Sequence, residues 1–214
     1  MFAPPVCSDS WLPCTVEVSS GRPGRMDEQA LVAAARTGNA SAFNTLVRTY
    51  QDIAFNVAYR MVGNMDGAAD ATQEAFLAAY RALPAFRGGS FKAWLLRIVT
   101  NACYDQLRHQ KRRPQALLDD LAEDSDYASA LVDHSQDPEA NLLREDLARA
   151  IEAGIAKLPL DQRVILVLSD VQGMTYDEIA EVTGVSLGTV KSRLSRARAR
   201  LRGYLTAGRE PFPC

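Results

Sequence analysis

Apolar residues recur along most of this chain at spacings of three and four positions, the period of an amphipathic helix. The pattern predicts a first run of four helices, and the residues that interrupt it mark their ends. The first helix is short and ends at Gly38, the second ends at Gly63, the third spans about Asp66 to Leu83, and the fourth runs from Phe91 to about Gln110. Pro84 terminates the third, because proline cannot continue a helix. This half of the chain is therefore predicted to be a four-helix unit.

A second helical region begins at Pro138, where leucines and isoleucines again recur on one stripe. Pro159 breaks that stripe, and the apolar segment from Val164 to Leu168 is predicted to be buried before Gly173 ends the region. The fold class predicted is all-α, with two small helical domains.

The segment from Met174 to Arg202 predicts a helix-turn-helix. Thr175 and Glu178 have the spacing of a capping box, in which each side chain satisfies a free backbone amide of the first helical turn. Gly184 permits the positive φ of a tight turn, and Ser186 can cap the following helix. The second helix of such a motif enters the major groove of DNA.

That second helix carries an apolar stripe on one side and positive charge on its other faces, with no acid after it before Glu210. A duplex would neutralise this charge, although a charge run can also be an ordinary solvated face. Residues away from the stripe are assigned to base edges and the remaining arginines to phosphates. The base-edge set is Lys191, Ser192, Ser195 and Arg196, and the phosphate set is Arg193, Arg198, Arg200 and Arg202.

On the predicted third helix, one face carries Asp70, Gln73, Glu74 and Leu77, opposite a face of alanines. Their spacing of i, i+3, i+4 and i+7 aligns them along the helix. Such a stripe suits a partner helix, but it is also what an acidic solvated face looks like. The residues alone leave both interpretations open.

The fourth helix and the loop before it combine cations with aromatic side chains. Single-stranded nucleic acid is bound in this way, with bases on rings and phosphates on arginine. The aromatic rings can equally belong to the core, and Asn101, a poor helix former able to hydrogen-bond a base edge, can equally be an exposed polar residue. The candidate set is Phe86, Arg87, Lys92, Trp94, Arg97, Asn101, Arg108 and Arg112.

Residues 114–138 contain many acids and no lysine or arginine, so they are predicted to be a flexible acidic linker. Residues 1–25 are rich in proline and glycine without helical periodicity, so they are predicted to be a disordered tail. Residues 208–214 are assigned to a C-terminal tail. Met26 precedes a clean helical pattern, which makes it a candidate for the true start codon.

The composition is that of a soluble protein, with 47% hydrophobic and 23% charged residues and a net charge of −2. No apolar run approaches the roughly 20 residues of a membrane span, so we expect no membrane insertion and a cytoplasmic location. The four cysteines and two histidines lack metal-ligand spacing. No phosphate loop or nucleophile motif is present, so we expect no cofactor and no enzymatic activity.

With these features in view, the chain resembles the extracytoplasmic-function (group IV) sigma factors of bacterial RNA polymerase, in the sigma-70 family. In the first domain the resemblance rests on Asp70 to Phe76, Tyr80 to Leu83, Phe86 to Gly88 and Trp94 to Asn101. In the second domain it rests on Leu158-Pro159, Gly173, Tyr176, Glu178 to Ala180, Gly188 to Arg193 and Arg196 to Arg198. The two sets occur in order on either side of the acidic linker.

The resemblance implies that residues 26–113 are sigma region 2 and residues 139–207 are sigma region 4. In such factors the positions of Asp70, Gln73 and Glu74 bind the clamp helices of the largest catalytic subunit of the polymerase, and the flap is a further contact. Region 2 reads the −10 element after melting, with Asn101 at the pocket for a flipped base. Region 4 reads the −35 element as duplex through Lys191, Ser192 and Arg196, and the linker enters the RNA path.

The implied function is to direct core polymerase to specific promoters, commonly under the control of an anti-sigma factor. The alternative is a helix-turn-helix activator that does not replace sigma, and co-purification with core polymerase separates the two. The loop Gly88-Gly89-Ser90 is one residue shorter than in some relatives, and Ser195 replaces a bulkier residue. Base preference at both elements is therefore left open.

Overall fold

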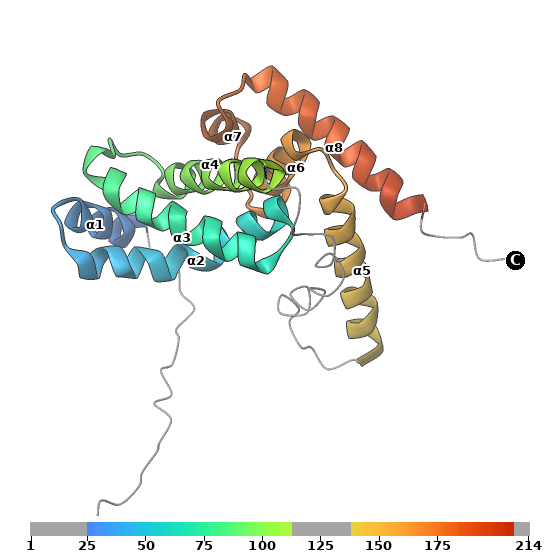
Figure 1. Ribbon diagram of the computed structural model, residues 1–214, viewed down its shortest axis with the longest axis horizontal. Coiled ribbons are helices and arrows are strands. Elements are labelled where there is room, and N and C mark those ends of the chain that lie inside the picture. The colour runs from blue at the N-terminus through green and yellow to red at the C-terminus, as the bar shows by residue number, and fades with distance from the viewer. Residues whose placement is uncertain (1–24, 113–137, 208–214) are drawn as a thin grey trace, which may run out of the picture.

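Every regular element of the computed structural model, which describes residues 25–112 and 138–207, is a helix (Figure 1). The predicted tails and acidic linker lie outside these ranges, except for Arg25 and Pro138, which begin helices. The backbone of Arg112 is described but its side chain is not. The first unit contains α1 (Arg25–Arg36), α2 (Ala40–Val62), α3 (Met65–Ala82), the short 3-10 helix η1 (Leu83–Ala85) and α4 (Phe91–Arg112). The second contains α5 (Pro138–Ala156), α6 (Leu160–Leu166), the π-helical turn η3 (Val167–Val171), α7 (Tyr176–Thr183) and α8 (Leu187–Ala207). The predicted all-helical fold is confirmed.

Local signals determine where the helices of the first unit begin and end. The Asn39 side chain accepts a hydrogen bond from the Ala42 amide at 3.1 Å and so caps α2. Gly63, at φ 90°, ends that helix in the left-handed conformation, and the Asn64 side chain then caps α3. The two long helices therefore reverse direction within two residues, which lets them lie side by side.

The first core lies between α2, α3 and α4. The face of α3 that turns inward carries only small side chains, and α2 and α4 contribute larger ones such as Leu46, Met61, Leu95 and Val99. Small residues let neighbouring helices approach closely. The buried alanines of α3 are Ala68, Ala71, Ala75 and Ala79. Because this face is committed to the core, the opposite face of α3 is left to solvent.

The second core is built around the segment from Val164 to Leu168, all five residues of which are buried as predicted. Val190, Leu194 and Ala197 of α8 pack onto it, together with Ile179 and Val182 of α7. The widened turn η3 was not predicted, because periodicity alone does not distinguish an α-helix from a single π-helical turn.

The two units pack directly against each other. Helix α4 contacts α7, and α2 contacts α5, α6 and η3 (Figure 1). The sequence analysis predicted the two units but not this contact between them. Sequence periodicity identifies which residues of a unit turn inward, but it does not show whether two finished units have complementary surfaces.

Candidate nucleic-acid interface

The helix-turn-helix is formed by α7 and α8. The Thr175 amide donates to the Glu178 carboxylate at 2.9 Å, and the Glu178 amide donates to the Thr175 hydroxyl at 3.3 Å. Gly184 takes the left-handed conformation at φ 69°, and the Ser186 hydroxyl accepts from the Thr189 amide at the start of α8. The capping box, the glycine turn and the second cap are thus confirmed. They hold α8 at a defined angle to α7.

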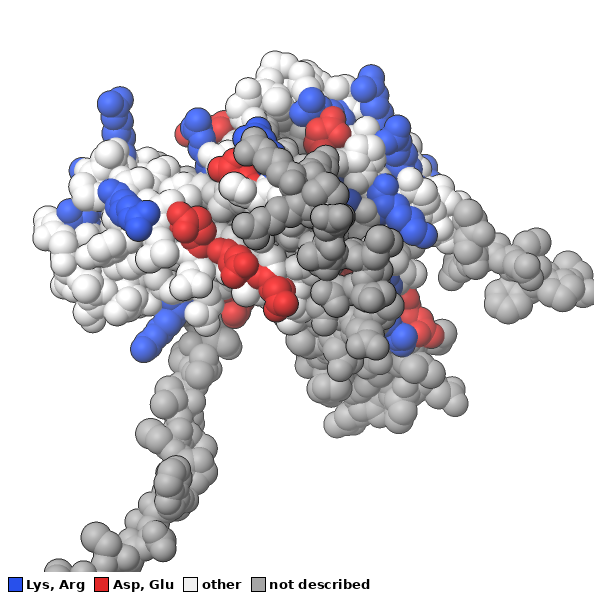
Figure 2. Space-filling model, viewed as in Figure 1, with Lys and Arg blue, Asp and Glu red and all other residues white. Residues whose placement is uncertain are grey.

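Helix α8 has one buried face and one open face. Val190, Leu194 and Ala197 are buried against the second core. The open side presents the predicted base-edge set, Lys191, Ser192, Ser195 and Arg196, all of which are exposed. Basic side chains follow this helix along the surface in Figure 2. The rigid apolar face therefore positions a polar and cationic face that DNA can reach.

Two of the predicted phosphate contacts, Arg198 and Arg193, form ion pairs with acidic side chains of the same protein at its surface. Arg198 forms two hydrogen bonds to the Asp170 carboxylate, at 2.9 and 2.6 Å, and Arg193 lies 3.3 Å from Asp161. The expectation that no acid neutralises this helix is therefore wrong. Asp161 precedes Arg193 by 32 positions and Asp170 precedes Arg198 by 28, so inspection of the helix alone missed them. Arg200 and Arg202 remain exposed.

The hydrogen bonds from Arg198 lower the pKa of Asp170 below its ordinary value. A depressed carboxyl pKa contributes stability that is present above the unfolded-state pKa, about 3.9, and is lost as the pH falls through the folded-state pKa. We therefore expect Asp170→Asn to be less stable than the native chain at pH 7, by about 0.5 to 1 kcal/mol because the pair is partly exposed. The difference should shrink below about pH 4. Urea unfolding at pH 7 and pH 3 measures both, and a difference independent of pH would contradict the role of this pair.

The candidate −10 surface, on α4 and the loop before it, is divided between exposed and buried side chains. Arg87, Arg97, Asn101 and Arg108 are exposed, so they can meet a ligand. Arg108 also lies 3.2 Å from Asp105, its neighbour on the same helix.

Phe86 was predicted to belong to this DNA-binding set, and the structure contradicts that prediction. It is only 6% exposed, and its ring lies 5.0 Å from that of Trp94 and 6.1 Å from that of Phe91. Phe86 therefore belongs to the aromatic part of the core, where edge and tilted ring packing stabilises it. Trp94 is half-buried in the same cluster and keeps part of its ring at the surface.

Lys92 differs from the other cations of α4 because it bridges the two units. Its ammonium group donates to the backbone carbonyl of Gln172 at 2.7 Å. Gln172 directly follows η3 in the second unit. A predicted DNA contact is thus part of the contact between the units.

The predicted partner stripe on α3 is exposed throughout. Asp70, Gln73 and Glu74 are exposed, and Leu77 is 46% exposed, so the stripe adds one apolar side chain to its polar ones. Figure 2 shows a row of acidic side chains over this part of the first unit. The acids of α3 are Asp66, Asp70 and Glu74, spaced four residues apart.

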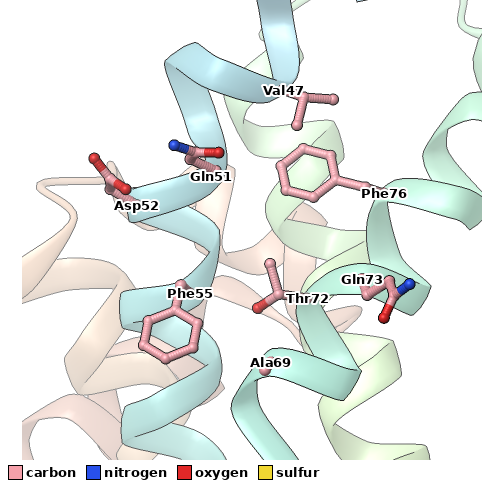
Figure 3. A pocket seen from close by; sticks show the side chains of 8 residues that line it. All are labelled: Val47, Gln51, Asp52, Phe55, Ala69, Thr72, Gln73 and Phe76. Carbon is pink, nitrogen blue, oxygen red and sulfur yellow. The ribbon is translucent and has the colours of Figure 1, made fainter. Parts of the chain in front are cut away.

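Gln73 also lines a cleft between α2 and α3, of about 380 Å³, which sequence reasoning missed (Figure 3). Phe55, Phe76 and Val47 supply its apolar walls, and Asp52 lies at its edge. The lining residues come from two helices. The one signal in the sequence is the spacing of three and four positions among the lining residues of α2, which places them on one face of that helix. The cleft makes the α3 stripe part of a larger surface with apolar and acidic character.

Among the helices that the structure describes, none combines the length and apolar character needed to cross a bilayer.

Each of the two helical units matches a known protein family. Residues 46–113 match the sigma-70 region 2 family, and residues 148–201 match sigma-70 region 4. The chain is 37% identical over 174 residues to the ECF RNA polymerase sigma factor SigE of Mycolicibacterium smegmatis, covering 79% of this chain and 65% of that protein. It is 38% identical over 176 residues to the ECF RNA polymerase sigma-E factor of Escherichia coli K12, covering 81% and 92%.

Among solved structures, the chain is similar to CnrH in its complex with the cytosolic domain of CnrY. The TM-score is 0.60 at 29% sequence identity, and the match covers 86% of this chain and 99% of CnrH. Family models, relatives and fold thus agree over both helical units, and an activator that shares only the helix-turn-helix does not account for region 2. The chain belongs to the extracytoplasmic-function sigma factors of RNA polymerase, the initiation factors of transcription.

Proposed function

We propose a division of labour among three exposed surfaces. The α3 stripe binds the clamp helices of the largest catalytic subunit of core polymerase, α4 reads the melted −10 element, and α8 reads the −35 element as duplex. The observation that carries this is the joint exposure of the three sets on separate helices: Asp70, Gln73, Glu74 and Leu77 on α3; Arg97, Asn101 and Arg108 on α4; Lys191, Ser192, Ser195 and Arg196 on α8. The polymerase flap is the proposed contact of region 4, and the cytoplasm is the proposed location.

The chemistry of each surface supports its assignment. A duplex is recognised by a helix whose first turns carry polar and cationic side chains, as on α8. An unpaired base is held by stacking and by hydrogen bonds to its exposed edge, for which α4 offers the partly exposed ring of Trp94 and the amide of Asn101. The α3 stripe is acidic, so it suits a protein surface rather than phosphates.

We also propose that an anti-sigma factor regulates this chain. CnrH, whose fold is similar, was solved as a complex with the cytosolic domain of CnrY. The cleft lined by Phe55 and Phe76, next to the α3 stripe, provides apolar area for a protein partner.

Run-off transcription with purified core polymerase tests the proposed function. We expect the chain to confer initiation at specific start sites on templates that core polymerase alone transcribes without selection. Sequencing of promoter fragments bound by the reconstituted holoenzyme then identifies both elements. Absence of start-site selection by the complete chain would refute the proposal.

Reversing one charge on the α3 stripe should weaken polymerase binding selectively. We expect Glu74→Lys to lower the affinity for core polymerase about fivefold, since an exposed interfacial charge contributes up to about 1 kcal/mol. Glu181→Lys is the matched control, because it makes the same charge change at an exposed position of α7. Competition binding against a labelled native chain measures both. Equal losses would show that net charge, and not the stripe, determines affinity.

A further inference from the structure

Positive charge collects at one end of region 2. Residues 29–51 and residues 75–104 contain no aspartate or glutamate, so all the charge that they carry is basic. Three arginines from these stretches are exposed: Arg36 in the last turn of α1, Arg81 in the last turn of α3 and Arg87 in the loop before α4. None of the three forms an ion pair with another described residue. Their charges can therefore meet a ligand.

The fold brings these three arginines to the same end of the unit. The Phe43 ring, near the start of α2, lies 4.9 Å from the Tyr80 ring in the last turn of α3. This contact places the turn between α1 and α2 beside the C-terminal end of α3. Helix α1 also contacts η1, which lies between Arg81 and Arg87 in the chain. Over this end of the unit, on the left of the view, Figure 2 shows basic side chains and no acidic ones.

The acids that border the two stretches do not neutralise these arginines. The Glu28 carboxylate accepts a hydrogen bond from the Tyr50 hydroxyl on α2, so it is already engaged within the fold. Glu74 precedes Arg81 by seven positions on α3, which is about 10 Å along a helix. Salt largely screens exposed charges from each other at that separation.

Unpaired cations that lie near one another favour a ligand with regularly spaced negative charge. A single strand of nucleic acid has one phosphate at every nucleotide, and binding to arginine releases the counterions that these phosphates hold. An acidic segment of a protein is the other class of ligand with such charge. The position of the arginines relative to α4 distinguishes the two.

The arginines continue the surface that is proposed to read the −10 element. Arg87 belongs to that set, and the loop that carries it leads directly into α4 with Arg97 and Asn101. Region 4, the proposed reader of the upstream element, follows the C-terminal end of α4 in the chain. The strand that α4 reads is therefore expected to continue downstream past the N-terminal end of α4. It is unpaired there, because synthesis at the start site requires an exposed template.

We propose that this arginine cluster, Arg36, Arg81 and Arg87, binds phosphates of the strand that α4 reads, between the −10 element and the start site. The inference rests on the proposed reading of the −10 element by α4. Contacts to phosphates carry no sequence information, so the cluster holds the strand whatever its bases are. It acts after strand separation, because it keeps the separated strand away from its complement.

Two promoter fragments with an unpaired −10 strand test the inference. In the shorter fragment this strand ends directly after the −10 element, and in the longer one it continues to the start site. The ratio of holoenzyme affinities for the longer and the shorter fragment, measured by fluorescence anisotropy, isolates the downstream strand. We expect Arg36→Ala with Arg81→Ala to lower this ratio about tenfold, from two exposed contacts of about threefold each. Arg87 stays unchanged, because it also belongs to the proposed −10 set.

The salt dependence reports the kind of contact. For the longer fragment, the slope of log affinity against log salt should fall by about 1.4 in the double variant, because each phosphate contact to a single strand contributes about 0.7. Replacing the downstream bases with abasic sites should leave the ratio of the native holoenzyme unchanged. A ratio lost with the bases would overturn the assignment to phosphates.

The matched control is Arg48→Ala with Arg149→Ala. Both arginines are exposed, and each has an acidic side chain one turn away on its own helix, Asp52 and Asp146. This pair of changes removes the same charge and should leave the affinity ratio at its native value.

Three results separate the inference from its alternatives. A native ratio in Arg36→Ala with Arg81→Ala would overturn the proposed phosphate contacts. A tenfold loss of core polymerase in a pull-down with the same variant would show that the cluster binds an acidic protein surface, and would also overturn them. Failure of the native holoenzyme to bind the shorter fragment would instead count against the proposed −10 reading by α4.

Discussion

Asn101→Ala is expected to reduce promoter opening by the holoenzyme about 10- to 100-fold, because a lost base-edge contact costs about 1 to 3 kcal/mol. Asn101 is exposed in the middle of α4, on the same side as Arg97 and Arg108. Strand separation costs about 1.4 kcal/mol per stacked step, so a base held outside the stack contributes directly to keeping the strands apart. The change should not unfold the helix, since alanine is the better helix former.

Permanganate reactivity of unpaired thymines measures the opening, and a pull-down with core polymerase measures binding separately. Asn44→Ala makes the same substitution at an exposed position of α2 and should alter neither quantity. We expect polymerase binding by Asn101→Ala to equal that of the native chain. Parallel losses in both assays would place the effect in the fold or in polymerase binding, and would remove Asn101 from the −10 site.

The parts of the fold that could be predicted are those encoded within a few residues. The capping box of Thr175 and Glu178 and the left-handed turn at Gly184 depend on neighbours three or four positions away. The same holds for the exposure of Asp70 and Glu74, because a helix that buries alanines on one face must expose the opposite one.

What could not be predicted depends on contacts between distant segments. The pair of Asp170 and Arg198 joins positions 28 residues apart, and that of Arg60 and Glu152 joins positions 92 apart. Neither has a local signature. Phe86 illustrates the same limit, because an aromatic residue beside an arginine can face solvent or the core, and only the packing of three rings decides.

These distant pairs change how the charge on α8 is interpreted. Arg193 and Arg198 lie on opposite flanks of the helix and are each held by an acid of the preceding segment. Their first effect is to fix α8 against the second core, so its open face is presented in one orientation. Lys191 and Arg196, which form no ion pair among the described residues, then carry the charge that is free to meet DNA.

Arg196→Ala should therefore relax selectivity at the −35 element by about 1 to 3 kcal/mol, the range for one specific arginine contact to a base. The side chain is exposed and projects from the open face of α8, one turn beyond Ser192, where a recognition helix approaches base edges. Binding of holoenzyme to a promoter series with single changes in the −35 element measures this. Discrimination should fall at one or two base positions and persist at the others.

Arg200→Ala is the informative comparison, because Arg200 lies one turn further along the same helix and is assigned to phosphate. Its loss should weaken all promoters of the series about equally and reduce the slope of log affinity against log salt by about one. Arg196→Ala should instead change the ranking of promoters more than the slope. If Arg196→Ala weakened every promoter by the same factor, Arg196 would contact the DNA backbone and not a base. Base reading by α8 would then be assigned to Lys191 and Ser192 instead.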